Sequence, residues 1–417
     1  MKLRNRFLLV GFGVVVFLVA TPILVLFTRG YQVDWANHRF VKTGVFVVKT
    51  LPTKAVVYLD NKKIKGNTPE TIRFVLPGDY DVRVEKDGYQ SWTKRLHIQA
   101  QLATWINFDR DFITLFKSQT QSLESASANF SSISKNGGEL AYVHNDLLYI
   151  YNVSNQTTQN LGDISGNSLP YTFSSNLEWT NATQVLALFS QNKPPITFDP
   201  KTIQKVISDG KYLLIVSNGQ IFTSKDNNLK FIDKQITGAA LDGENLWYIQ
   251  NRTLKQYNLR TESVATVLEN LSPSSIASIT RGDGNTFLIL DNSLYTINDG
   301  LEKIYDGVNF ANYDTSAHKL LFANNNEVLV YNPAQKNTEL IVRSISPVTH
   351  PLLNSYTGYV FFVNENKIKA IELDGRDHRN VYTIQNLTDS NSNFTLNSEG
   401  SVLTIFSDSK VESFSIR

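Results

Sequence analysis

The feature that most limits how this chain can fold is a hairpin pattern that recurs through its C-terminal part. Each copy is an apolar strand, a short turn rich in Asn, Asp and Gly, and a second strand in which apolar and polar residues alternate. Eight copies begin at residues 139, 184, 211, 245, 286, 319, 359 and 402, which gives a period of about 38 residues. A lone hairpin cannot bury its apolar face, but four-stranded sheets packed around a ring bury both faces of one another. The pattern predicts an all-β chain whose main part, residues 118–417, is a β-propeller.

The spacing predicts eight blades, with seven as the alternative. The interval from residue 184 to residue 211 is too short for a full blade, so one blade is trimmed or two hairpins share one. The last hairpin ends at Arg417 and leaves no residues for an outer strand. We expect residues 118–125 to supply that strand and so to join the two ends of the ring, because an unpaired sheet edge is a liability.

The first 29 residues have the pattern of a membrane anchor. Roughly 21 uncharged residues, from Phe7 to Phe27, form a helix of ~30 Å, the thickness of a hydrocarbon core. Three cations, Lys2, Arg4 and Arg6, precede them, and the positive-inside rule puts this end in the cytoplasm and the rest outside. A cleaved signal peptide is the alternative, but its apolar stretch should be shorter and end at a small-residue site. We therefore expect a single-pass, uncleaved signal anchor in the cell membrane that contacts lipid through residues 7–27.

A membrane-proximal linker, residues 30–43, leads to a small β-domain at residues 44–115. From Asp79 to Lys86 apolar and polar residues alternate, as in a half-buried antiparallel strand. A turn at Asp87-Gly88 follows, and on the return strand Trp92, Leu96 and Ile98 share one face. Short strands with one apolar face predict a small β-sandwich.

A set of spaced residues in this domain matches a known pattern. It consists of Ala55-x-Val57-x-Leu59-Asp60, Gly66-x-Thr68-Pro69, Leu76-Pro77-Gly78-x-Tyr80-x-Val82-x-Val84 and Gly88-Tyr89. In this respect the domain resembles the PEGA domain, although the naming motif reads Pro52-Thr53-Lys54-Ala55 and its middle two positions differ. The resemblance implies a structural or binding module of the cell envelope and carries over no active-site residue.

Two segments of the repeat region carry a second resemblance. SISKNGGELAYV (residues 132–143) has a serine, an Asn-Gly turn and a Leu-Ala-Tyr strand, and IELDGRDHRNVYTI (residues 371–384) has a Leu-Asp-Gly turn before an outer strand. In these features residues 118–417 resemble the WD-like repeats of bacterial periplasmic propellers. This implies a bacterial protein whose propeller lies outside the cytoplasm.

Composition and motifs exclude several functions. The chain has no cysteine, so disulfides, thiolate metal sites and a cysteine nucleophile are excluded. Acidic residues outnumber basic ones in residues 116–417, so we expect no nucleic-acid partner. Phosphate-binding loops, nucleophile elbows and metal-binding motifs are absent from the sequence. We expect no catalytic, cofactor-binding or metal-binding residue and no cofactor.

Three polar or aromatic groups have both a functional and a structural interpretation. Asp374 to Asn380, the densest polar cluster, is interpreted as a solvated turn between two blade strands. The Arg-Gly-Asp triplet at 281–283 is interpreted as the turn before a strand, although it is an adhesion motif in other proteins. Tyr89 and Trp92 are interpreted as core aromatics, with an exposed carbohydrate or membrane platform as the alternative.

Together these patterns predict a non-enzymatic cell-envelope binding protein that presents its propeller for protein or glycan binding. The partner is then an envelope protein or polysaccharide, and the sequence assigns no binding residue. The alternative is a propeller-based carbohydrate-active enzyme, a hydrolase or lyase with carboxylates at the central channel. A sensor is a third possibility, but the residues on the cytoplasmic side are too few for a signalling domain.

Overall fold

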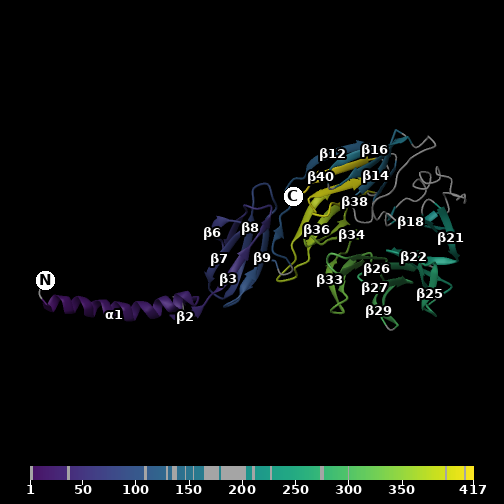
Figure 1. Ribbon diagram of the computed structural model, residues 1–417. Coiled ribbons are helices and arrows are strands. Elements are labelled where there is room, and N and C mark those ends of the chain that lie inside the picture. Colours follow the sequence, from purple (N-terminus) through teal and green to yellow (C-terminus); the bar gives the residue numbers. More distant parts are fainter. Residues whose placement is uncertain are drawn as a thin grey trace. The chain divides into compact units, whose positions relative to one another are not determined.

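In the computed structural model the chain divides into two compact units (Figure 1). The structure describes residues 3–417 except 35–37, 108–109, 128–129, 134–138, 146, 154, 164–177, 180–202, 209–211, 226–227, 273–276, 299, 390–391 and 408–409. The first unit comprises residues 1–119, residues 372–380 and Arg417, and the second comprises residues 120–371 and 381–416.

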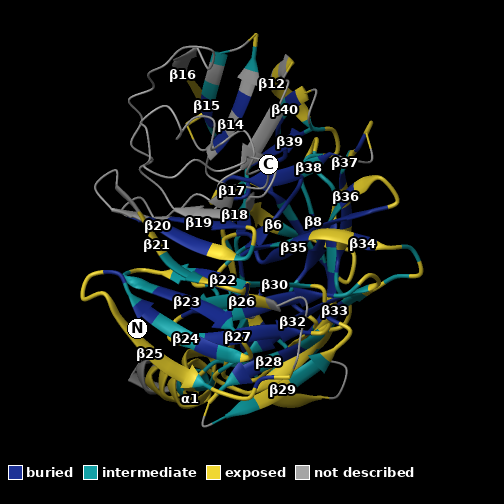
Figure 2. Cartoon of the chain, turned by 90° about the vertical axis from the view of Figure 1, so that its right-hand side faces the viewer, coloured by how far each residue is buried: buried dark blue, intermediate teal, exposed yellow. Residues whose placement is uncertain are grey.

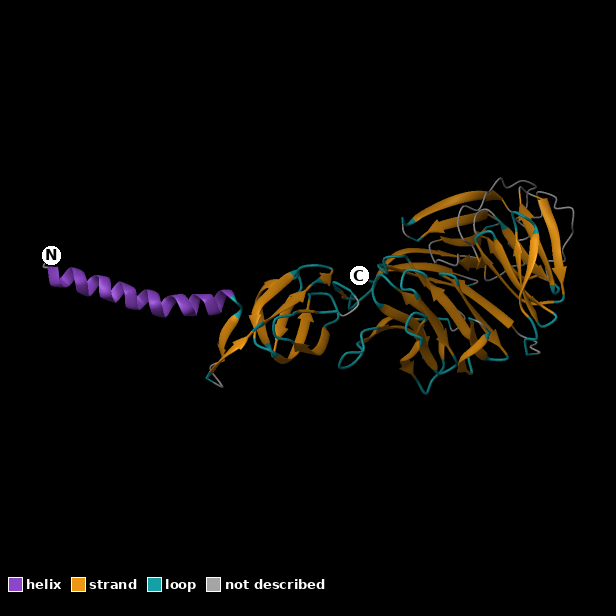
Figure 3. Ribbon diagram, turned by 60° about the horizontal axis from the view of Figure 1, so that its bottom comes forward, coloured by secondary structure: helices purple, strands orange, loops and turns teal. Residues whose placement is uncertain are grey.

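The first unit begins with the apolar helix that the sequence predicts. This helix, α1, runs over Leu3–Thr28 (Figure 3). It contains Pro22. Its stretch Val10–Thr28 is long and apolar enough to cross a membrane, and none of it is buried against the rest of the protein. An exposed apolar helix of this length is characteristic of a membrane anchor or a signal sequence.

The rest of the first unit is a hairpin followed by a β-sandwich, which confirms the predicted fold. The hairpin consists of β1 (Tyr31–Asp34) and β2 (Arg39–Lys42). The two facing sheets have the orders β10-β3-β7 and β6-β5-β8-β9, and a short parallel pair joins β11 to β4. Their strands are β3 (Gly44–Val48), β4 (Thr50–Leu51), β5 (Val56–Leu59), β6 (Lys62–Asn67), β7 (Glu70–Val75), β8 (Gly78–Glu85), β9 (Trp92–Ile98), β10 (Ala103–Trp105) and β11 (Ile113–Thr114).

The core of the sandwich forms from alternating residues of both sheets. On β9, Trp92, Leu96 and Ile98 are buried as predicted, and Trp92 has no exposed surface. The alternative in which Trp92 belongs to an exposed platform is therefore wrong. Because side chains alternate along a strand, Lys94 also points into the core, and it is only 2% exposed.

The second unit consists of antiparallel sheets, each built mainly from consecutive strands, as expected of propeller blades. The first sheets comprise β13 (Phe130–Ile133), β14 (Glu139–His144), β15 (Leu147–Asn152) and β16 (Thr157–Asp163), then β17 (Glu178–Trp179), β18 (Ile203–Ser208), β19 (Leu213–Ser217), β20 (Gln220–Lys225) and β21 (Asn228–Lys234). The next comprise β22 (Ile236–Asp242), β23 (Asn245–Gln250), β24 (Thr253–Asn258) and β25 (Ser263–Leu268), then β26 (Ala277–Gly282), β27 (Asn285–Leu290), β28 (Ser293–Ile297) and β29 (Leu301–Asp306). The last comprise β30 (Phe310–Asp314), β31 (Lys319–Ala323), β32 (Glu327–Asn332) and β33 (Asn337–Arg343), then β34 (Val348–Asn354), β35 (Tyr359–Asn364), β36 (Lys367–Glu372) and β37 (Val381–Asn386), and finally β38 (Asn393–Leu396), β39 (Val402–Phe406) and β40 (Lys410–Ser415) with β12 (Gln121–Ser127).

Seven of the eight predicted hairpins coincide with strand pairs of this unit: β14–β15, β19–β20, β23–β24, β27–β28, β31–β32, β35–β36 and β39–β40. The hairpin predicted at residue 184 lies outside the described residues, so the number of blades stays a prediction. Several turns are the two-residue kind that requires positive φ at both positions. Asn251-Arg252 and Asp291-Asn292 have such φ values, which explains the Asn and Asp of the repeat.

The two ends of the second unit meet in one sheet. Strand β12 pairs antiparallel with β40, and the sheet order is β12-β40-β39-β38 (Figure 1). This confirms the predicted closure, since the outer strand missing at the C-terminus comes from the segment that precedes the first blade. This pairing covers the edge of β40 and gives the last blade its fourth strand.

The blades bury the apolar faces of one another. Every residue of β35 is buried, and β27 is buried at all positions but its first, whereas the outer strand β25 is exposed almost throughout (Figure 2). Buried clusters span neighbouring sheets: one combines Leu246 and Tyr248 of β23 with Ile221 of β20. This confirms the prediction that the first strand of each hairpin is apolar on both faces because sheets cover it on both sides.

Candidate functional site

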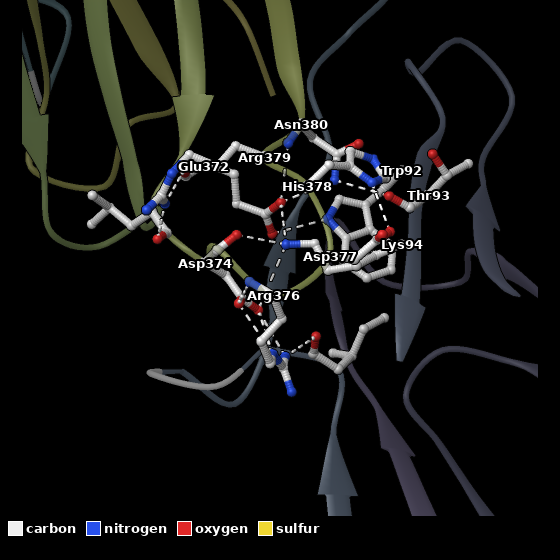
Figure 4. Close-up of polar contacts among 12 residues, drawn as sticks. Trp92, Thr93, Lys94, Glu372, Asp374, Arg376, Asp377, His378, Arg379 and Asn380 are labelled. Carbon is white, nitrogen blue, oxygen red and sulfur yellow. Dashed lines mark hydrogen bonds and ion pairs between the residues drawn. The ribbon is translucent and has the colours of Figure 1, made fainter. Parts of the chain in front are cut away.

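A polar cluster of the first unit surrounds the buried Lys94 (Figure 4). The Lys94 ammonium lies 3.0 Å from Oε2 of Glu372 and donates a hydrogen bond of 2.7 Å to the backbone oxygen of Asp374. The Glu372 carboxylate is fully buried as well, and it accepts hydrogen bonds from Nε1 of Trp92 at 3.1 Å and Nδ2 of Asn380 at 2.9 Å. Both charges therefore have partners inside the protein.

The second carboxylate of this cluster, Asp374, is held by Arg376. The Arg376 guanidinium lies 2.7 Å from Oδ2 of Asp374 and also donates to the backbone oxygen of Ile106 at 2.9 Å. Burial acts to raise the pKa of Asp374, but the hydrogen bonds from Arg376 and the charge of Lys94 outweigh it and hold this pKa below its ordinary value. Asp374 is therefore ionised at neutral pH.

The interpretation of residues 374–380 as a solvated turn is wrong in one respect. The segment does connect two blade strands, β36 and β37, but Asp374 is only 7% exposed and the segment belongs to the first unit. Removing one partner of a buried ion pair of this kind leaves an uncompensated charge in the core, so the two segments depend on each other. The one signal in the sequence is a lysine at an inward position of a strand, between Trp92 and Leu96.

The prediction that the Arg-Gly-Asp triplet is a turn holds for Asp283 alone, because Arg281 and Gly282 are the last two residues of β26. The side chains of Arg281 and Asp283 contact neighbouring blades. Arg281 lies 2.9 Å from Oδ2 of Asp242 and 3.8 Å from the centre of the Trp247 ring. Asp283 accepts a hydrogen bond of 2.9 Å from the hydroxyl of Tyr313, and burial with this bond raises the pKa of Tyr313 to about 12. The triplet is therefore part of the packing between blades.

An open pocket of about 790 Å³ lies on the second unit, across two neighbouring blades. Because neighbouring strands alternate in direction, the turn after the second strand of each blade and the link after the fourth strand meet at one end of the sheets. The pocket is lined from these segments by Asn292, Gly307, Asn309, Asn324, Asn325, Asn326, Glu327, Arg343, Ser344 and Ile345.

Hydrogen bonds fix the wall of the pocket. The side-chain oxygen of Asn324 accepts from the backbone N–H groups of Asn326 at 2.9 Å and Glu327 at 2.7 Å, which closes the turn. The amide of Asn326 donates to the backbone oxygens of Ser344 at 3.0 Å and Ile345 at 3.1 Å. The turn and the link therefore form one surface.

The charges of the pocket belong to Glu327 and Arg343, which lie 2.6 Å apart. A hydrogen bond from Asn324 has the largest effect on the pKa of Glu327, and together with Arg343 it lowers this pKa against the opposing effect of burial. The Glu327 side chain is 13% exposed and that of Arg343 67%. The cation is therefore the charge that faces solvent.

The chemistry of this pocket suits binding by hydrogen bonds. Exposed amides of Asn292, Asn309 and Asn325 offer both donors and acceptors, and Ile345 adds a fully exposed apolar side chain at the edge. Among the lining residues Glu327 is the one carboxylate. Across the described part of the chain, no group of three or more His, Cys, Asp or Glu side chains is arranged to hold a metal ion.

Sequence reasoning assigned no binding residue and missed this pocket. The available signal is the run Asn324-Asn325-Asn326, which makes the β31–β32 turn three residues long. The turns of β19–β20, β23–β24 and β27–β28 have two residues. The longer turn changes the surface at one blade only, but the pocket also needs residues from the preceding blade and from the link that follows β33.

The fold defines the class of protein, one with an apolar N-terminal helix, a small β-sandwich and a propeller. Within the sandwich, residues 43–110 match the PEGA domain family, and the chain thus carries a PEGA domain, as the resemblance in the sequence indicated. No curated protein matches the chain.

Several solved structures match the chain, each with a TM-score below 0.5. The extracellular domain of BT4673 from B. thetaiotaomicron matches with 14% identity and a TM-score of 0.42 over 71% of this chain and 39% of that chain. Kluyveromyces lactis Hsv2 matches with 9% identity and a TM-score of 0.43 over 69% of this chain and 90% of that chain. PorZ, a surface component of the type-IX secretion system of Porphyromonas gingivalis, matches with 10% identity and a TM-score of 0.39 over 90% and 45%. The chain thus spans less than half the length of the first and third of these structures.

Proposed function

We propose that this chain is a non-enzymatic protein of the bacterial cell envelope that presents its propeller outside the membrane to bind a protein or a glycan. In this proposal α1 is a single transmembrane anchor with its N-terminus in the cytoplasm. The apolar, exposed stretch Val10–Thr28 supports the anchor, and the cations that precede it support the orientation. The PEGA match at residues 43–110 supports the envelope location.

The observation that carries the binding function is the pocket of about 790 Å³ with exposed amides on its wall. Hydrolysis of a glycosidic bond ordinarily needs two carboxyl groups on either side of the bond, one of them protonated. Glu327 is the one carboxylate of the lining, and its lowered pKa makes it a poor proton donor. The lining of this pocket therefore supports binding rather than hydrolysis at this place.

Deleting residues 1–29 tests the anchor. We expect the full chain in the membrane fraction and the shortened chain in the soluble fraction, because the deletion removes the apolar helix, which is long enough to span the bilayer. Protease added outside intact cells should digest the propeller, since it lies outside the membrane in this proposal. A shortened chain that stays with membranes, or a propeller that resists protease until the cells are opened, would contradict the proposal.

Titration with soluble envelope polysaccharide fragments and with envelope peptides tests the binding. We expect one of these probes to bind the full chain in nanodiscs, and Arg343→Gln and Asn325→Ala to weaken that binding, measured by calorimetry. Arg260→Gln is the matched control, because Arg260 is 71% exposed and also pairs with a glutamate, outside the pocket.

Two outcomes would count against a binding pocket. One is equal weakening by Arg260→Gln and Arg343→Gln, which would show a general charge effect. The other is release of cleaved glycan that Glu327→Gln abolishes, which would favour the enzyme.

A further inference from the structure

The hairpin β1–β2 follows the apolar helix without a flexible linker. The helix ends at Thr28, and the N–H of Gly30 still donates to the oxygen of Phe27 at 3.0 Å. The backbone oxygen of Gly30 accepts from both the N–H and the hydroxyl of Thr43, at 2.8 and 2.7 Å. The hairpin is thus fixed between the end of the helix and the sandwich, where the chain would leave a bilayer.

One face of this hairpin combines apolar, aromatic and cationic side chains. Tyr31 lies opposite Lys42 and Val33 opposite Phe40, so these four share a face. Phe40 is 55% exposed although it is large and apolar. The ammonium of Lys42 lies 5.7 Å from the centre of the Tyr31 ring and donates to Oε1 of Gln101 at 3.1 Å, which holds it beside the apolar group.

The charged side chains next to this face that are exposed to solvent are mainly cations. Arg39 pairs with Asp34 at 3.5 Å, but the arginine side chain is 67% exposed and the aspartate side chain only 12%. Arg29, at the end of the helix, is exposed as well. An exposed aromatic ring beside exposed cations matches the interface of a membrane, where rings lie at headgroup depth and cations near phosphates.

We propose that the hairpin β1–β2 is a binding site for anionic phospholipid headgroups. Phe40 inserts at the level of the headgroups, and Arg29, Arg39 and Lys42 contact the lipid phosphates. This rests on the proposed anchor, because α1 must span the bilayer to bring the hairpin to its surface. The contact fixes the sandwich against the membrane surface and depends on the charge of the lipid.

A single spin label measures this contact in the full chain. The protein has no cysteine, so His38→Cys places one label, at an exposed residue beside Arg39. The labelled protein is reconstituted in nanodiscs of phosphatidylcholine alone or mixed with phosphatidylglycerol. Collision with oxygen, which concentrates in lipid, and with a water-soluble nickel chelate then reports the depth of the label.

We expect the label to lie at headgroup depth in the anionic nanodiscs and in water in the neutral ones. Adding Arg39→Gln and Lys42→Gln should shift it into water, since each cation near an anionic surface changes the affinity on the order of fivefold. Adding Phe40→Ser should also shift the label toward water. Lys230→Gln, which removes an exposed cation from the second unit, should leave the depth unchanged.

Other outcomes overturn the proposal. A label in water in both lipids, or at the same depth after Arg39→Gln and Lys42→Gln, shows that the hairpin does not bind anionic lipid. Loss of the contact with excess free phosphate at constant ionic strength shows a phosphate site instead. Failure of the whole protein to enter nanodiscs of either composition contradicts the anchor itself, and it is detected separately by flotation.

Discussion

The Lys94 cluster and the pocket at Glu327 contain similar groups in opposite environments. In each, a carboxylate pairs with a cation and accepts a hydrogen bond from an asparagine amide. Lys94 and Glu372 are fully buried, whereas the cation of the pocket, Arg343, is 67% exposed. The free energy of a buried ion pair depends on complete hydrogen bonding, but an exposed pair contributes little to stability and stays accessible to a ligand. Burial therefore separates the Lys94 cluster, which is part of the core, from the pocket that we propose as a binding surface.

Lys94→Met should have the largest effect on the free energy of unfolding, because Glu372 and Asp374 then stay buried without the cation that they share. Loss of one partner of a buried ion pair typically destabilises by about 3–5 kcal/mol. Hydrogen exchange of the β9 amides in the full chain measures this as faster opening of the first unit. The double variant Lys94→Met with Glu372→Met should recover part of the loss, and no recovery would show that the charges themselves do not matter.

Gly282→Ala should have the next largest effect on stability, at the last residue of β26. A Cβ at this position would lie 1.9 Å from Cδ1 of Tyr313, so the ring must move. Overpacking of this kind costs about 1–3 kcal/mol, which thermal unfolding of the second unit would detect. Gly300→Ala is the control, since nothing lies within 4 Å of its added Cβ. An unchanged melting temperature for Gly282→Ala would mean that the blades do not pack tightly here.

Acidification should weaken the Lys94 cluster. The pKa of Asp374 is lowered in the folded protein, so its stabilising contribution is present above the pKa of the unfolded chain. It is lost as the pH falls below about 4 and passes through the lower folded pKa. Hydrogen exchange of the β9 amides measures this loss between about pH 5 and about pH 3, a range that includes the ordinary pKa of an aspartate. In Asp374→Asn the dependence should be flatter, and an identical dependence would assign the effect to other carboxylates.

Glu327→Gln in the pocket should have the smallest effect on stability. Glu327 pairs with an exposed arginine, and pairs of this kind contribute about 0–1 kcal/mol. We expect the melting temperature of the second unit to change little while ligand binding weakens. A loss as large as that of Lys94→Met would remove the contrast between the two clusters.

Much of the fold could be predicted from local patterns. The alternation along Asp79–Lys86 and the hairpins near residues 211, 245 and 286 follow from side-chain direction in strands, which depends on neighbours in the sequence. The positive φ of Asn251 and Asp291 explains why Asn and Asp mark the turns. The pairing of β12 with β40 was also predictable, because a count of strands leaves the last blade one strand short.

The candidate sites could not be predicted in the same way. Residues 374–380 are polar, and polarity near a turn is typical of a solvated surface. Nothing local shows that Lys94 and Asp374, 280 positions apart, meet in one buried cluster. The run Asn324–Asn326 was visible, but its role depends on links that come from separate blades.

The sequence by itself determined the apolar helix, the β-structure and the turns of the repeat, because each depends on residues close together along the chain. Only the tertiary structure decided which charges are buried and which face solvent. Burial is set by segments distant in the sequence that pack together, and that packing makes Lys94 part of the core while Arg343 stays at an open surface.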